Sequence, residues 1–71
     1  MKKRSLMIAG HATSVSVEEE FWDELRAIAL ARGVSINQLA ADIDASRPAE
    51  AGNLSSAIRL FVLAEVKRGR G

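Results

Sequence analysis

The chain has 71 residues with no cysteine and one histidine, which leaves room for one domain and excludes both a disulfide framework and a structural zinc site. Hydrophobic residues make up 48% of the sequence, and so small a domain buries that much apolar surface most readily in an oligomer. The net charge is +1, but both ends are basic and residues 18–24 hold five acidic side chains, so the ends are suited to a polyanion or serve only solubility.

The first residues are basic, and the apolar segment that follows them, Leu6 to Ala9, is too short for a signal peptide. No run of apolar residues is long enough to span a membrane, so we expect a cytoplasmic protein. We expect residues 1–11 to form a basic N-terminal arm and residues 12–71 to form the folded domain.

A short strand is predicted next, because residues 13–17, TSVSV, alternate β-branched residues with serines. One face of this strand holds Thr13, Val15 and Val17, and the other face holds Ala12, Ser14 and Ser16. Apolar residues before Gly10 follow the opposite parity, so the strand either begins near Leu6 and bends or begins only at Ala12.

Three helices are predicted after the strand, over residues 18–32, 36–45 and 54 to about 67. Acidic residues load the first turn of the first helix, and Gly33 is placed to end it in the left-handed conformation. Ser35 and Gln38 form a capping box for the second helix, and Asn53 is a good N-cap for the third. The third helix is apolar on nearly all sides, which predicts contact with a partner subunit.

No motif of an enzyme is present in the sequence, and we expect no catalytic residue, cofactor, metal or small-molecule ligand. The segment from Asp42 to Asn53 begins like a calcium loop, but Arg47 stands where the loop needs glycine and Asn53 where it needs a carboxylate. His11 is the only histidine and has no orienting partner nearby in the sequence, so it is either a surface residue or a contact to nucleic acid.

An isolated strand leaves its backbone groups unpaired, so this strand needs a partner. Unless the segment before Gly10 folds back as a hairpin, the partner is the same strand of a second copy. The result is a two-stranded ribbon with one polar face, which fits the major groove of DNA.

Residues Thr13 to Ile43, TSVSVEEEFWDELRAIALARGVSINQLAADI, resemble the ribbon-helix-helix family, the Arc/MetJ-type DNA binders. The resemblance rests on a strand that enters an acidic helix start, on Phe21-Trp22, and on Gly33-x-Ser35 before the next helix. With NLSSAIRLFVL at 53–63, the chain is similar to a subgroup of small bacterial proteins with an extra C-terminal helix.

The resemblance implies a mainly α fold, a homodimer, possible higher assembly on DNA, and a function as transcriptional regulator or repressor. It implies that outward ribbon side chains contact bases and that the start of the second helix binds a phosphate. These positions are Ala12, Ser14 and Ser16 on the ribbon and Ser35, Ile36 and Asn37 on the helix.

This sequence departs from the family pattern because its strand has no long polar or basic side chain on the outer face. We therefore expect Lys2, Lys3, Arg4 and His11 to contribute further contacts to DNA. The alternative function is a protein-interaction module on the same dimeric fold, either antitoxin-like or a partner in assembly, since a fold does not fix a function.

Overall fold

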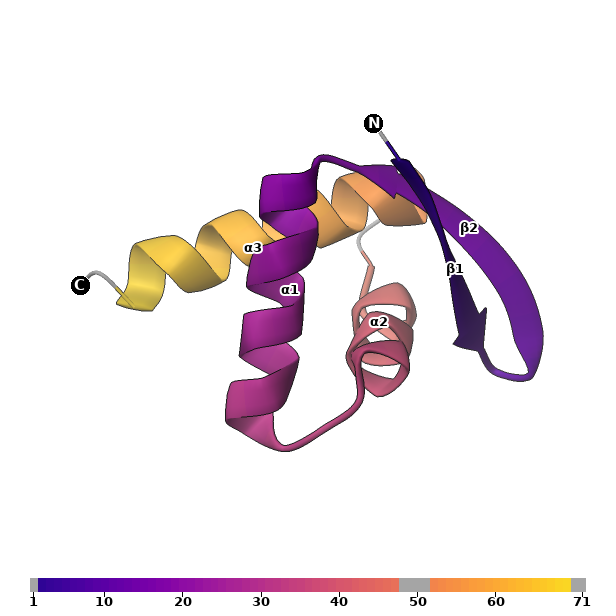
Figure 1. Cartoon of the computed structure of the whole chain (residues 1–71), viewed down its shortest axis with the longest axis horizontal. Helices are drawn as coiled ribbons and strands as arrows, with labels where there is room; N and C mark the ends of the chain where they lie inside the picture. The colour runs from indigo at the N-terminus through magenta and orange to yellow at the C-terminus, as the bar shows by residue number, and fades with distance from the viewer. Residues whose placement is uncertain (1, 48–51, 70–71) are drawn as a thin grey trace.

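The computed structural model of the chain describes residues 2–47 and 52–69, apart from the side chain of Lys2. In chain order the elements are β1 (Lys2–Ile8), β2 (His11–Val17), α1 (Glu19–Arg32), α2 (Ile36–Ala45) and α3 (Leu54–Gly69). Figure 1 shows the two strands as a twisted ribbon at one end of the molecule, with the three helices packed beside it. The predicted mainly α fold with a two-stranded ribbon is confirmed.

Both strands of the ribbon come from the same chain. β1 pairs antiparallel with β2 in a register that places Lys2 opposite Val17 and Ile8 opposite His11. Ala9 and Gly10 join the strands with φ values of 52° and 80°, and positive φ at both central residues is what a two-residue type I′ hairpin turn requires. The hairpin alternative is therefore confirmed, and the chain contains two ribbon strands where one was predicted.

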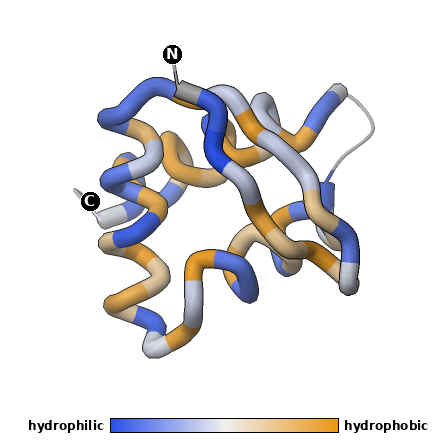
Figure 2. The backbone as a smooth tube through the Cα atoms, turned by 45° about the vertical axis from the view of Figure 1, so that its right-hand side comes forward, coloured by the Kyte–Doolittle hydropathy of each residue, from blue (hydrophilic) through white to orange (hydrophobic). Residues whose placement is uncertain are grey.

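This hairpin also explains why the hydrophobic parity changes near Gly10. The turn reverses the chain, so Leu6 on β1 lies directly opposite Thr13 on β2 and shares its face. Residues 2–8 form a strand that pairs with β2, so this part of the expected basic N-terminal arm belongs to the ribbon. Figure 2 shows that β1 is hydrophilic at its N-terminal end and hydrophobic near the turn, so the apolar alternation is visible in only a small part of the strand.

The two faces of the ribbon differ in burial. Leu6, Val15 and Val17 point inward and are at most 2% exposed. The other face, which we call the outer face, consists of three cross-strand pairs: Lys3 with Ser16, Ser5 with Ser14, and Met7 with Ala12. The predicted division of β2 into an apolar inner and a polar outer side is therefore confirmed.

The helix ends follow the local sequence signals. Gly33 ends α1 with a φ of 71°, and its N–H donates to carbonyls of the last turn. The Ser35 Oγ accepts the Gln38 N–H at 3.0 Å at the start of α2, while the Gln38 side chain donates to Asp42 and does not return to Ser35. The Asn53 Oδ1 accepts the N–H of Ser56 at 2.9 Å and caps α3.

The hydrophobic core lies where the ribbon and the three helices meet. Its largest fully buried side chains are Val15, Val17, Leu25, Leu39 and Ile58, which come from β2 and from every helix. α3 packs against α1, α2 and β2 and so closes the core within one chain (Figure 1). The expected two-sided burial of α3 is only partly seen, because Leu60 and Leu63 remain 54% and 49% exposed. Among the described residues, no helix is long and apolar enough to cross a membrane.

Candidate nucleic-acid interface

The outer face of the ribbon gathers most of the predicted base contacts. Ala12 and Ser14 are exposed there, and Ser16 is half-buried at the end near α1. β1 adds Lys3, Ser5 and Met7, which are also exposed. None of these described outer-face residues is acidic. Successive pairs on one face are two residues apart, ~7 Å, so the three pairs span about 14 Å and match the size of a major groove.

The start of α2 lies beside the β1 edge of the ribbon. The Met7 N–H donates to the Asn37 Oδ1 at 3.2 Å, which fixes this helix start next to the strand. Ser35 caps the helix and accepts the N–H groups of Gln38 and Leu39 through its Oγ and its carbonyl oxygen. Within the described hydrogen bonds, the N–H groups of Ile36 and Asn37 remain available, and free amides at the positive end of a helix suit a phosphate.

The roles of the three predicted phosphate-site residues therefore differ. Ser35 acts as the N-cap, and the amide side chain of Asn37 holds the ribbon. Ile36 is half-buried and packs against the core. The backbone N–H groups of this helix start are placed for an anion, and the side chains of Ser35 and Asn37 help to hold the helix start in position.

α3 lies along the other edge of the ribbon and binds β2 near its end. The Ser55 Oγ accepts the Ser16 N–H at 3.0 Å, and the Arg59 Nη2 donates to the Ser16 carbonyl at 3.0 Å. Both backbone groups of Ser16 are thus paired with α3. A second copy of β2 would have to break these two hydrogen bonds to pair with β2 at Ser16.

Arg59 also connects α3 to the start of α1. The Arg59 Nε donates to the Glu18 Oε1 at 2.8 Å. This hydrogen bond lowers the pKa of the Glu18 carboxyl below its ordinary value of 4.5. Through Ser16 and Glu18, one guanidinium fixes the angle between the ribbon and the helices.

Arg4 does not lie where a phosphate contact was predicted. It belongs to the inner side of β1, pairs with the Glu19 carboxylate and stacks over Trp22, with the guanidinium carbon 4.9 Å from the ring centroid. An arginine held by an acid and an aromatic ring on α1 is directed away from the outer face. The alternation of the strand puts Arg4 there, since its neighbours Lys3 and Ser5 face outward.

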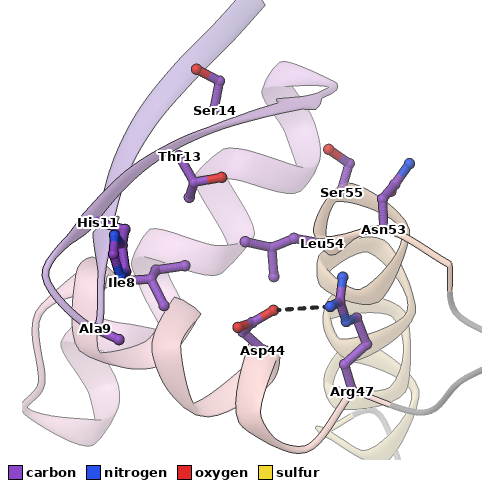
Figure 3. A pocket seen from close by; sticks show the side chains of 10 residues that line it. All are labelled: Ile8, Ala9, His11, Thr13, Ser14, Asp44, Arg47, Asn53, Leu54 and Ser55. Carbon is purple, nitrogen blue, oxygen red and sulfur yellow. Dashed lines mark ion pairs between the residues drawn. The ribbon is translucent and has the colours of Figure 1, made fainter.

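His11 also lies apart from the outer face. It begins β2 and lines an open cavity of about 540 Å³ under the hairpin turn, together with Thr13, the Asp44–Arg47 ion pair and the start of α3 (Figure 3). Ser14 points away from Leu54 in the same view, toward the outer face. His11 and Ser14 both line this cavity, but His11 belongs to a cross-strand pair of the inner face and Ser14 to a pair of the outer face. The side chain of Lys2 lies outside the described part of the chain.

Comparison with known protein families matches residues 1–66 to the ribbon-helix-helix domain. The chain belongs to the ribbon-helix-helix family. The match includes most of α3, which agrees with the extra C-terminal helix expected from the sequence. Ribbon-helix-helix domains generally bind DNA, as regulators or antitoxins, and are not enzymatic folds. Comparisons with curated proteins and with solved structures gave no match.

Two residues of this ribbon-helix-helix domain were not predicted as part of the interface, Ser5 and Met7. They lie on the outer face because the two-residue turn fixes the register of β1 against β2. A turn with φ above zero at two successive residues is the signal that would have placed them, but an Ala-Gly pair is a weaker sequence marker of such a turn than Asn-Gly. No group of three or more His, Asp or Glu side chains within the described residues forms a metal site.

Proposed function

We propose that the protein binds double-stranded DNA with the outer face of its ribbon in the major groove and acts as a transcriptional repressor. The observation that carries this proposal is an exposed two-stranded face with a lysine and no acidic residue, bordered by the start of α2. The width of a two-stranded ribbon suits the major groove, and the helix start suits a neighbouring phosphate. Because its target is DNA, we assign the protein to the cytoplasm.

The contacts divide into two kinds. Ser5 and Ser14 face each other across the ribbon and are placed to hydrogen-bond base edges. Lys3 lies further toward the open end, and together with the backbone amides of Ile36 and Asn37 it supplies the attraction to phosphates. Since serine hydroxyls accept and donate, these serines tolerate several bases, and much of the affinity is electrostatic.

We further propose that the protein is a homodimer with one complete ribbon in each chain, and that dimers can associate further on DNA. The support is the exposed apolar side of α3, where Leu60 and Leu63 lie on the surface although they are as hydrophobic as the core residues. Each subunit then brings its own ribbon to the DNA, and two ribbons contact two half-sites related by the two-fold axis of the dimer.

Salt dependence of DNA binding tests the proposed function. The affinity for a mixed-sequence duplex is measured at several salt concentrations for the wild type and for Lys3→Gln. The slope of log affinity against log salt scales with the number of phosphates that the protein neutralises, by about 0.9 for each, so Lys3→Gln is expected to flatten the slope by that amount per chain. Deleting residues 1–4 would be a poor substitute, because it would remove part of β1.

Lys67→Gln is the matched control, because Lys67 is an exposed lysine near the C-terminal end of α3, and this end of the helix lies far from the ribbon (Figure 1). It is expected to leave the slope unchanged. Equal slopes for the wild type and both variants would exclude the contact of Lys3 with DNA.

An antitoxin-like or assembly module is the second candidate function. Its support is that Leu30, Leu60 and Leu63 are 83%, 54% and 49% exposed, more apolar surface than a monomeric DNA-binding domain needs. Failure to bind any duplex at low salt, combined with a folded protein, would favour this second function over DNA binding.

A further inference from the structure

We propose that Met7, with Ala12 opposite it, is the residue that makes the ribbon select thymine, by contacting the C5-methyl group in the major groove. This inference rests on the proposed binding of DNA by the outer face. It adds a specific base to that function and a residue from the strand that was not expected to belong to the ribbon.

The exposure of Met7 is the first observation. Its side chain is 55% exposed, whereas the other large apolar side chains described on the ribbon are buried or packed against the core: Leu6, Ile8, Val15 and Val17. Met7 is not part of the hydrophobic core, so its apolar side chain does not contribute to core packing. Contact with apolar surface of a partner on the outer face would bury this side chain.

The position of Met7 is the second observation. Met7 and Ala12 are directly opposite in the register. The Met7 N–H points outward to Asn37, and the Ser16 N–H, in the same set of alternating pairs, points outward to Ser55. These are therefore pairs that do not exchange backbone hydrogen bonds, in which the Cα atoms approach to about 4.5 Å. The side chains of Met7 and Ala12 thus form one small apolar surface.

The neighbouring pairs show why this surface decides specificity. Ser5 and Ser14 form the next pair along the outer face, ~7 Å away, a distance of about two base pairs. Their hydroxyls satisfy either donors or acceptors on bases. Thymine is the only standard base with a methyl group in the major groove, so an apolar pair next to polar ones favours thymine at one place in the site. The Asn37 hydrogen bond holds this place next to the start of α2.

Replacement of thymine by deoxyuridine removes the methyl group and leaves all hydrogen-bonding atoms in place. Bound sequences are first selected from a pool of randomised duplexes, and each thymine of the selected site is then replaced singly. One replacement per ribbon is expected to weaken binding by the ratio that burial of one methyl group produces, about fourfold. The other replacements are expected to have no comparable effect.

The variant Met7→Gln tests whether Met7 makes the contact with the thymine methyl group. The variant keeps the length of the side chain and replaces an exposed residue, so it is expected to fold and to bind thymine and deoxyuridine duplexes equally. Met7→Leu keeps an apolar side chain and is expected to retain the preference. Leu30→Gln makes the same kind of change at a residue that is 83% exposed on α1, and it is the control that leaves the preference intact.

Three results would overturn the inference. Duplexes with and without the methyl groups that bind the wild type equally would disprove thymine selection while DNA binding stands. A preference that survives in Met7→Gln would assign the methyl contact to another residue. Absence of binding to any duplex at low salt would reject the proposed function together with this inference.

Discussion

Ala9 adopts a backbone conformation that residues other than glycine rarely adopt. Its φ is 52°, and it is the only non-glycine residue described with a positive φ. A left-handed conformation costs an L-residue with a Cβ about 1–2 kcal/mol, whereas asparagine tolerates it and is preferred at this position of a type I′ turn. We predict that Ala9→Asn raises the free energy of unfolding by roughly 0.5–1 kcal/mol, measured by urea denaturation.

Gly10→Ala is the opposite change at the same turn. Nothing lies within 4 Å of a Cβ placed there, so any loss of stability comes from the φ of 80° and not from a clash. A decrease of about 1 kcal/mol or more in the free energy of unfolding is expected. An unchanged or higher stability of Gly10→Ala would contradict the hairpin as described.

Glu18 makes the stability depend on acid pH. Its pKa is lowered in the folded protein because Arg59 hydrogen-bonds the charged carboxylate, so its contribution is present above its ordinary pKa of 4.5. That contribution is lost as the pH falls through the lower pKa of the folded state. Glu18→Gln should therefore flatten the decline of the melting temperature below pH 4.5, and an unchanged decline in this variant would contradict the role of the Arg59 hydrogen bond.

At the scale of elements, the helices could be predicted and one strand could not. Capping residues and Gly33 are local signals, and they placed the start of α2 and α3 correctly and the end of α1 at Arg32. α3 continues to Gly69, slightly beyond the predicted end, because no residue before it stops the helix. β1 consists of basic and polar residues at its beginning, and its inner position at Arg4 is filled by an ion pair and a Trp22 contact instead of an apolar side chain.

α3 is the element that makes one chain sufficient for the core. Ile58 is fully buried and belongs to α3, the helix that packs against α1, α2 and β2. We predict that Ile58→Ala lowers the free energy of unfolding by about 2–5 kcal/mol, the usual range for a large-to-small change in a core. Leu60→Ala, on the exposed side of the same helix, is the control. If it lowered the free energy of unfolding of the monomer as much as Ile58→Ala, the core would extend to this surface.

At the scale of the whole molecule, the core is closed within one chain, so we expect the chain to fold without a partner subunit. Sedimentation equilibrium at micromolar concentration is expected to give twice the chain mass of 7.7 kDa, as proposed for the homodimer. Because Leu60 and Leu63 are not needed to close the core, the double variant Leu60→Ser, Leu63→Ser should sediment as a folded monomer. A dimer that persists in this variant would move the subunit contact to another surface.

Some residues of the candidate site could be predicted from local sequence patterns, whereas others depend on contacts between distant parts of the chain. Ala12, Ser14 and Ser16 could be placed on one face from alternation alone, because a strand needs no partner to fix its faces. The contributions of Lys3, Ser5 and Met7 depend on the register of the hairpin, which pairs residues of the two strands across the turn. The positions of Arg4 and His11 could not be predicted, since they depend on α1 and on the cavity between the ribbon and the helices.

The most direct test of the central claim is an amide chemical-shift titration of the ¹⁵N-labelled protein with a DNA duplex at low salt. Binding by the outer face is expected to shift the amides of β1 and β2 from Lys3 to Met7 and from Ala12 to Ser16, together with Ile36 and Asn37, and to leave the acidic start of α1 unaffected. Shifts confined to α1 or to the exposed side of α3, with an unperturbed ribbon, would contradict the account.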